Sequence, residues 1–263
     1  MDNWLAWLII VLTIGLVIFQ IWKDRTAFPR FVALKKSEDR RKHMRNWLFS
    51  GILKFSGLGV LGLFLLGHLD ALTGFPDILS DPLNSLLNSL GIGDSAANLI
   101  LWAFVGVFVL IMVVLTILPA LMDTSEMPDD GVFAMLPRNP KEMGWTAALS
   151  VNAGIGEEIF FRCLLPIAVI EATGSFSAAL LICTLLFGFA HGYQGIVGVM
   201  TTMFVGAVFL VIYLLSGSLW FAMALHIATD LRGLVILPLI LKWFDRFPDD
   251  VQESGETPAN VLP

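Results

Sequence analysis

The chain has 263 residues, of which 57% are hydrophobic and 14% are charged, and its formal net charge is −6. This apolar content exceeds what the core of a soluble domain of this size requires, so the composition excludes an ordinary soluble protein. Nucleic-acid binding is not expected either, because the charge balance is acidic and the sequence has no phosphate-binding glycine loop. The chain is therefore predicted to be a polytopic membrane protein.

An all-α helical bundle is expected, because apolar windows of about 20 residues, the length of a membrane-spanning helix, recur along the chain. About seven spans are predicted, and tryptophans lie at or near their ends, where indole rings favour the headgroup level. The spans lie near residues 4–22, 47–66, 99–122 and 145–170, in the stretch 176–215, which 191–195 divides in two, and near 219–243.

The loop between the first two spans is strongly basic, whereas the next loop, residues 68–98, has no Lys or Arg. By the positive-inside rule the basic loop is cytoplasmic, which places the N-terminus outside and, with seven spans, the C-terminus in the cytoplasm. Setting the topology is the favoured role of the basic loop over binding of a specific lipid. Its cations are Lys23, Arg25, Arg30, Lys35, Lys36, Arg40, Arg41, Lys42 and Arg45.

Two further segments lie outside the predicted spans. In the outer loop 68–98, leucine and isoleucine recur at helical intervals, which indicates an amphipathic helix that lies on the membrane surface or packs on the bundle. The last segment, 244–263, is acidic, and its Asp, Glu, Pro and Ser content suits a solvated, poorly ordered tail.

The polar residues of the last four spans are the candidate functional site, because ionisable groups in a bilayer core are costly and usually face the protein interior. Glu158 and Arg162 are four residues apart and share a helical face, whereas Glu157 is rotated by about 100° from Glu158. An Arg beside one carboxylate holds it ionised and oriented. The reactive role is therefore assigned to Glu157 and a supporting role to Glu158 and Arg162.

Two histidines complete the candidate site. His226 and Asp230 are four apart, so the carboxylate is expected to accept from one imidazole nitrogen and leave the other for substrate, water or metal. His191 ends the fifth span. The set Glu157, His191 and His226 suits a divalent metal such as zinc, but it equally suits metal-free activation of water, and the sequence leaves both open.

Depth in the membrane poses a problem for this site. With these boundaries Glu157 lies about 18 Å from the cytoplasmic end of its span at 1.5 Å per residue, while His191 is near the cytoplasmic end of its own. For the two to meet, the fourth span has to begin later than residue 145 or the fifth has to extend past Gly192.

Three short motifs resemble, in order and rough spacing, those of the CPBP family, the CAAX proteases and bacteriocin-processing enzymes, also called ABI. They are Glu157-Glu158-x-x-x-Arg162, Phe187-x-x-x-His191 and His226-x-x-x-Asp230. The resemblance implies an intramembrane protease in which the glutamate and first histidine activate water, while His226 and Asp230 bind metal or stabilise the oxyanion. Family members are commonly described as metalloproteases, but a metal-free glutamate mechanism has also been argued for them. The relatives that carry Asp at the last position include many bacterial proteins, so a bacterial plasma membrane is the expected location.

The resemblance divides the chain into three parts. Residues 1–144 form an N-terminal transmembrane region with about three spans, residues 145–243 form the catalytic core with about four, and 244–263 form the tail. The expected partners are the lipid bilayer and a membrane-associated protein or peptide substrate. Members that cleave prenylated CaaX proteins have Asn where this chain has Asp230, which weakens any transfer of that specificity. The alternatives are a non-catalytic binding factor, such as a bacteriocin-immunity protein, and a small proton-linked transporter.

Overall fold

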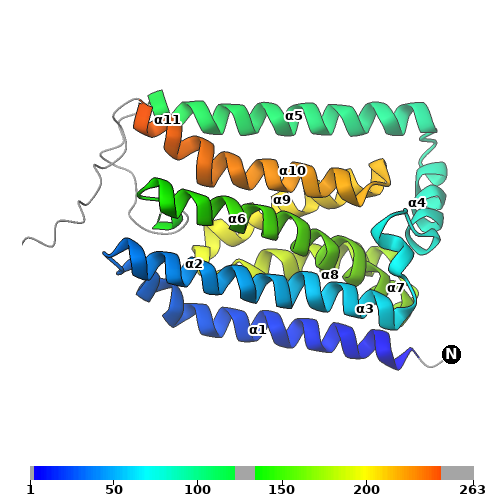
Figure 1. The fold of residues 1–263 in the computed structure, drawn as a ribbon. Helices are drawn as coiled ribbons and strands as arrows, with labels where there is room; N and C mark the ends of the chain where they lie inside the picture. The colour runs from blue at the N-terminus through cyan, green and yellow to red at the C-terminus, as the bar shows by residue number, and fades with distance from the viewer. Residues whose placement is uncertain (1–2, 122–133, 244–263) are drawn as a thin grey trace, which may run out of the picture.

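The computed structural model describes residues 3–121 and 134–243, which form a bundle of long helices running side by side (Figure 1). No strand occurs in these two ranges, so the predicted all-α class is confirmed. The predicted tail, 244–263, lies outside the described residues. The first half of the chain contains α1 (Trp4–Val32), α2 (Ser37–Gly51), the π-helix η1 (Ile52–Gly57), α3 (Leu58–Leu66), η2 (Leu69–Leu72), α4 (Asp77–Ser89) and α5 (Asp94–Leu121).

The second half carries the candidate site and begins after the undescribed residues 122–133. Its two continuous helical runs each contain a π-helical segment, η5 or η7. The elements are α6 (Pro140–Glu158), η5 (Ile159–Leu164), α7 (Leu165–Thr173), α8 (Phe176–Ala190), η6 (Gly192–Gln194), α9 (Gly195–Ser216), α10 (Leu219–Leu231), η7 (Arg232–Ile236) and α11 (Leu237–Trp243).

Five helices are long and apolar enough to cross a membrane, which agrees with a multi-pass membrane protein. They correspond to the first, second, third, sixth and seventh predicted spans. The predicted break at 191–195 is confirmed, because α8 ends at Ala190 and α9 begins at Gly195. The fourth predicted span, now α6 to α7, and the fifth, the 15-residue α8, do not meet the same criteria of length and composition. The total of seven spans therefore stays a prediction.

The ends of the helices that carry the site are set by local sequence. Asn139 caps α6 by accepting a hydrogen bond from the Glu142 N–H, and Pro140 follows as the first helical residue, where its missing N–H has no consequence. Ser175 and Ser218 cap α8 and α10 in the same way. Gly174 ends α7 in the left-handed region with φ of 68°, a conformation that other residues adopt at a steric cost.

The segment η5 and α7 forms the centre of the bundle. Every residue from 159 to 169 is buried, whereas α5 at one side exposes most of its apolar side chains. In Figure 1, α6 lies between α2 and α10, and α5 lies beyond α10. In a membrane protein the exposed apolar faces contact lipid, and the most enclosed helix is the one able to carry charges. The central position of α6 and η5 therefore suits their Glu and Arg residues.

The predicted amphipathic segment in the outer loop is α4. It lies across one end of the bundle in Figure 1. Leu79 and Leu83 are buried, and Leu83 packs with Leu210 and Leu214 of α9. Leu86 and the following Leu90 are exposed. One face thus packs on the bundle, and the other is free to lie in the headgroup region.

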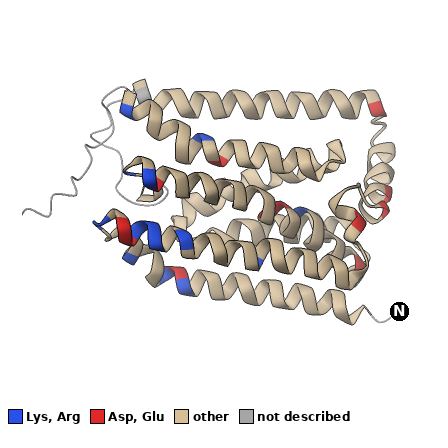
Figure 2. Cartoon of the chain, viewed as in Figure 1, with Lys and Arg blue, Asp and Glu red and all other residues tan. Residues whose placement is uncertain are grey.

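The end of the bundle opposite α4 carries most of the basic residues (Figure 2). A buried ion pair there joins α2 to α6, with Arg40 Nε 3.1 Å from Glu142 Oε2 and neither side chain exposed. Arg40 also donates to the carbonyls of Ala134 and Leu136, and Glu142 accepts from the Arg138 N–H. This network fixes the start of α6 relative to α2.

Replacing Glu142 with Ala should destabilise the protein by about 3–5 kcal/mol, because the Arg40 charge is then left buried without its carboxylate. Thermal unfolding in detergent micelles measures the effect. Glu38→Ala, a change at an exposed position of α2, is the control and should leave the unfolding midpoint nearly unchanged. Equal midpoints for the two variants would show that the pair does not hold the helices together.

Candidate active site

Glu157 and Glu158 are the last two residues of α6, and the chain continues directly into the π-helical segment η5. Single π turns within α-helices are frequent at functional sites. Arg162 in η5 lies with its Nε 3.3 Å from Glu158 Oε2, and the two side chains are 2% and 0% exposed. The pairing of Glu158 with Arg162 expected from their spacing is therefore present in the structure.

Glu158 also binds the second histidine. Its Oε1 accepts a hydrogen bond from His226 Nδ1 at 2.8 Å. Asp230 was expected to take that role, but its Oδ2 instead lies 3.9 Å from the other ring nitrogen, Nε2. The long-range contact from α6 replaces the local one because Glu158 and His226 are both buried where the two helices meet, whereas the Asp230 side chain is 30% exposed.

Glu157 faces the first histidine. Its Oε2 lies 3.8 Å from His191 Nε2, and the two side chains are 13% and 16% exposed. His191 Nδ1 lies 2.8 Å from the carbonyl oxygen of Phe187. Since a carbonyl only accepts, His191 Nδ1 carries the hydrogen, and a neutral ring presents a lone pair at Nε2. Glu157 Oε2 is buried without a hydrogen-bond partner among the described residues.

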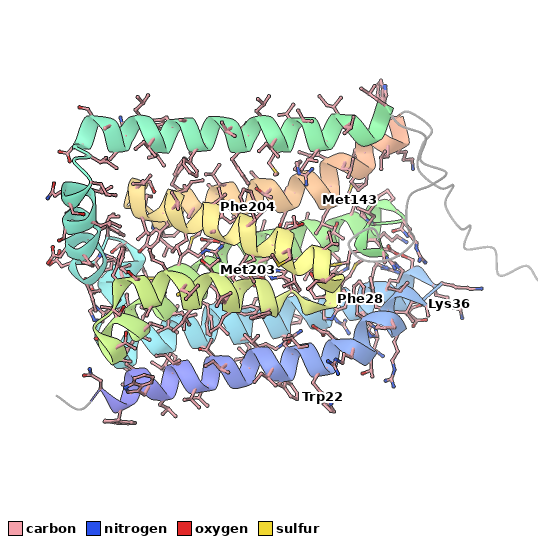
Figure 3. The ribbon with its side chains drawn as sticks, turned by 180° about the vertical axis from the view of Figure 1, so that it is seen from behind. Trp22, Phe28, Lys36, Met143, Met203 and Phe204 are labelled. Carbon is pink, nitrogen blue, oxygen red and sulfur yellow. The ribbon has the colours of Figure 1, made fainter. Side chains whose placement is uncertain are left out.

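Glu157 and His191 approach each other for neither of the two reasons expected from the sequence, a later start of the fourth span or a longer fifth span. The helix carrying Glu157 begins earlier than residue 145, at Pro140, and the helix before His191 ends at Ala190 without extending past Gly192. The 15 residues of α8 span about 22 Å, less than the roughly 30 Å of hydrocarbon. The short helix therefore leaves His191 inside the bundle. In Figure 3, Lys36 marks the basic end and Phe28, whose ring packs on Tyr193 just after His191, lies short of it.

Aromatic rings enclose the buried charge. The guanidinium carbon of Arg162 lies 3.9 Å from the centre of the Phe187 ring and 5.8 Å from that of Phe209. The Phe209 ring is 5.0 Å from the imidazole of His226. Arginine stacked on aromatic faces is stabilised by cation–π attraction in a desolvated site. Phe187, the first residue of the second motif, therefore has a structural role, because its ring stacks on the guanidinium of Arg162.

Close helix contacts position these groups, and sequence reasoning missed the residues that make them. A Cβ on Gly154 of α6 would lie 2.8 Å from the backbone nitrogen of Ile227, the neighbour of His226. Gly206 of α9 contacts the Phe187 ring so closely that no side chain fits, and its carbonyl accepts from Arg162 Nη2 at 3.4 Å. The only sequence signal was glycine within apolar spans, which is typical of close helix packing but does not identify the partner.

The donor types of the expected metal set suit zinc, which binds His nitrogen and carboxylate oxygen. Their arrangement does not. Within the described ranges, no group of three or more His, Cys, Asp or Glu side chains is placed to hold a metal ion. Glu157, His191 and His226 thus do not form a ligand set in this structure, and the chemistry is derived below from the side chains alone.

The comparison with protein families agrees with this site. Residues 139–232 match the family described as type II CAAX prenyl endopeptidase Rce1-like. The matched segment runs from the capping residue of α6 into η7 and contains all six candidate site residues, so the predicted resemblance to CAAX-type intramembrane proteases of the CPBP family is confirmed. Neither the curated proteins nor the solved structures gave a match.

Gly154→Ala should destabilise the protein by about 1–3 kcal/mol, because the added methyl group forces the backbone of α10 away from α6. Thermal unfolding in detergent measures the change. Gly144→Ala is a matched control on α6, since a Cβ there has nothing within 4 Å. A Gly154→Ala protein as stable as the Gly144→Ala protein would contradict the close contact beside His226.

Proposed function

We propose that the chain is an intramembrane endopeptidase that hydrolyses peptide bonds of membrane-associated proteins or peptides with water activated by Glu157 and His191. The observation that carries the proposal is the buried, unpartnered Oε2 of Glu157 at 3.8 Å from the Nε2 of His191. The family match supports a CAAX-type protease.

A water molecule at hydrogen-bond distance, about 2.8 Å, from both atoms can donate one hydrogen to Glu157 Oε2 and the other to His191 Nε2. Both are acceptors when Glu157 is ionised and His191 is neutral. The water oxygen then has its lone pairs free for a carbonyl carbon. The geometry therefore suits general-base catalysis, with Glu157 as base and His191 as its partner.

The reaction balances with these groups alone. The water oxygen bonds to the peptide carbonyl carbon, one water proton passes to Glu157, and the carbonyl electron pair moves to oxygen. When the intermediate collapses, the carbon–nitrogen bond breaks and the proton on Glu157 passes to the leaving nitrogen. The products are a carboxyl end and an amine end, and Glu157 is again ionised.

The supporting roles are divided between the other polar residues. Arg162 lies beside one oxygen of Glu158 and His226 Nδ1 lies 2.8 Å from the other, so both oxygens of this carboxylate are engaged and Glu158 takes the supporting role. Asp230 lies beside His226 Nε2 and completes the polar lining. A helical substrate has its peptide groups paired and shielded, so it has to unwind locally before hydrolysis.

We further propose that the chain has a catalytic core over residues 145–243 and an N-terminal region over 1–144 that supports it. Contacts of α1 and α3 with the core agree with this division, since α1 packs on α7 and α8 and α3 packs on η5. The basic end faces the cytoplasm in this proposal, which leaves the N-terminus outside, at the opposite end of the bundle (Figure 1).

Glu157→Gln should reduce hydrolysis by about 10²–10⁴-fold without changing thermal stability, because the amide cannot accept the water proton. The assay uses purified protein with quenched CaaX-type and generic transmembrane peptides. Glu38→Gln, an exposed change on α2, is the control and should retain full activity.

Metal content is measured on the same samples by elemental analysis. A Glu157→Gln protein as active as wild type would overturn the assignment of the base. A folded wild type that binds a peptide tightly and never cleaves it would favour the non-catalytic binding role.

A further inference from the structure

We infer that a cleft between α2 and α6 binds the phosphate group of a membrane phospholipid. The cleft has a volume of about 270 Å³ and lies at the basic end of the bundle (Figure 2). It does not touch the candidate active site, so the inference does not rest on the proposed hydrolysis. Its lining residues are Glu38, Asp39, Arg41, Lys42 and Arg45 of α2 and Trp145 of α6.

The three cations of the cleft come from one face of α2. Arg45 is four residues from Arg41 and three from Lys42, so both are its neighbours on the helix surface. Arg40 has a different role, because its side chain is fully buried in the ion pair with Glu142. The helix thus uses one cation to hold α6 and presents three others to the cleft.

These three cations have no anionic partner among the residues that the structure describes. Arg41, Lys42 and Arg45 take part in none of the ion pairs of the described ranges. The Nε of Arg41 is also shielded from solvent without a hydrogen-bond partner there. A shielded donor on a cation costs free energy until an acceptor binds it, so an anion in the cleft would stabilise this end of the bundle.

The level of the cleft along the bundle indicates that the anion comes from the bilayer. The 30 residues of the helical run Ser37–Leu66 span about 45 Å, more than the roughly 30 Å of hydrocarbon, so its polar first turns extend into the headgroup region. Residues 41–45 lie in these turns. Trp145 lies at nearly the same level, since Arg40 and Glu142 pair one turn before it. Phospholipid phosphates are the anions present at this level of the bilayer.

Trp145 supplies the apolar part of the cleft. Its half-buried side chain packs against the cluster of Phe28, Phe31 and Met44. Indole rings favour the headgroup level, where their apolar body meets the lipid and their N–H remains free to donate. A phospholipid carries apolar groups next to its phosphate and can use both the cations and the indole ring, whereas a free phosphate ion can use only the polar groups.

The acidic first turn of α2 sets the direction in which the headgroup lies. Asp39 is in this turn, and Arg45 is about 9 Å farther along the helix at 1.5 Å per residue. Figure 2 shows the acidic turn nearer the end of the bundle than the basic stretch that follows it. In a phospholipid the phosphate is next to the acyl chains, and the rest of the headgroup lies outside it. The phosphate therefore faces the cations, and an outer group without a further negative charge fits best.

Binding in the cleft is distinct from setting the topology. The positive-inside rule depends on how many cations flank a span, so every cation of the basic loop contributes to it. The cleft instead depends on where three of them lie. Arg25 and Arg30 of α1 are exposed at the same end of the bundle but do not line the cleft. These two residues therefore provide a control with the same change in charge.

The first test compares Arg41→Gln/Arg45→Gln with Arg25→Gln/Arg30→Gln. Phosphatidylethanolamine is titrated onto delipidated protein in detergent, and bound lipid is counted by native mass spectrometry. The dissociation constant should rise by about 10-fold or more for the cleft variant, because each Arg donates charge-assisted hydrogen bonds to the phosphate, and the control should match wild type. Thermal unfolding without lipid checks that both variants are folded. Equal affinities of the two variants would overturn the inference.

Phosphatidylglycerol separates a cleft from general surface charge. A basic surface attracts anionic lipids, so it would prefer phosphatidylglycerol, and both double variants would lose this preference alike. The cleft should bind phosphatidylethanolamine at least as tightly as phosphatidylglycerol, and Asp39→Asn should shift the preference toward phosphatidylglycerol. A wild-type preference for phosphatidylglycerol that the two double variants lose equally would show a charged surface only and contradict the cleft.

Inorganic phosphate separates a lipid from a soluble phosphate compound. It lacks the apolar groups that pack on Trp145, so it should displace phosphatidylethanolamine only at about 10²-fold or more higher concentration than a short-chain phosphatidylethanolamine does. Displacement at equal concentrations would assign the cleft to a free phosphate compound and sink the lipid. None of these measurements uses a peptide substrate, so their outcome is independent of whether the protein hydrolyses peptides.

Discussion

The carboxylate of Glu158 is the group on which the rest of the site depends. One oxygen holds His226 on α10, and the other lies beside Arg162 on η5. A single buried charge thus links consecutive turns of the central helix to a helix far along the chain. Desolvation of a buried charge is costly unless it is paired, so these partners are required for the fold as much as for chemistry. Because His226 and Arg162 both contact Glu158, the adjacent Glu157 keeps one carboxylate oxygen without a hydrogen-bond partner among the described residues.

Much of this assignment of roles to the polar residues was predictable from their spacing in the sequence. Four-residue separations indicated the contact between Glu158 and Arg162 and placed Asp230 beside His226, and the three motifs predicted the family that residues 139–232 match. The choice of Glu158 as the partner of His226 was not predictable, because it depends on how α6 and α10 approach each other at Gly154. A sequence shows which faces are polar within one helix, whereas contacts between helices depend on packing.

Depth was the other feature that sequence reasoning could not settle. Apolar length predicts that a helix crosses the bilayer, but α8 is too short to do so alone, and its end places His191 inside the bundle. Tyr193 and Gln194, whose side chains are hydrogen-bonded to each other, both lie on that recessed turn. A short helix between two long ones therefore carries information that hydropathy does not show, namely where polar side chains meet within the membrane.

The π-helical segment Ile159–Leu164 affects how this protein tolerates change over evolution. A π turn holds more residues than an α turn, so deletion of one residue allows a regular α-helix to form there. The helix after the deletion keeps its orientation, because the wider turn had accommodated the extra residue within a single turn. The buried face of Leu165–Thr173 would therefore still point toward the core, and the change would be confined to the side chains of the π segment itself. A gap of a single residue in an alignment at this position would thus mark the loss of the π turn and not a rotated helix.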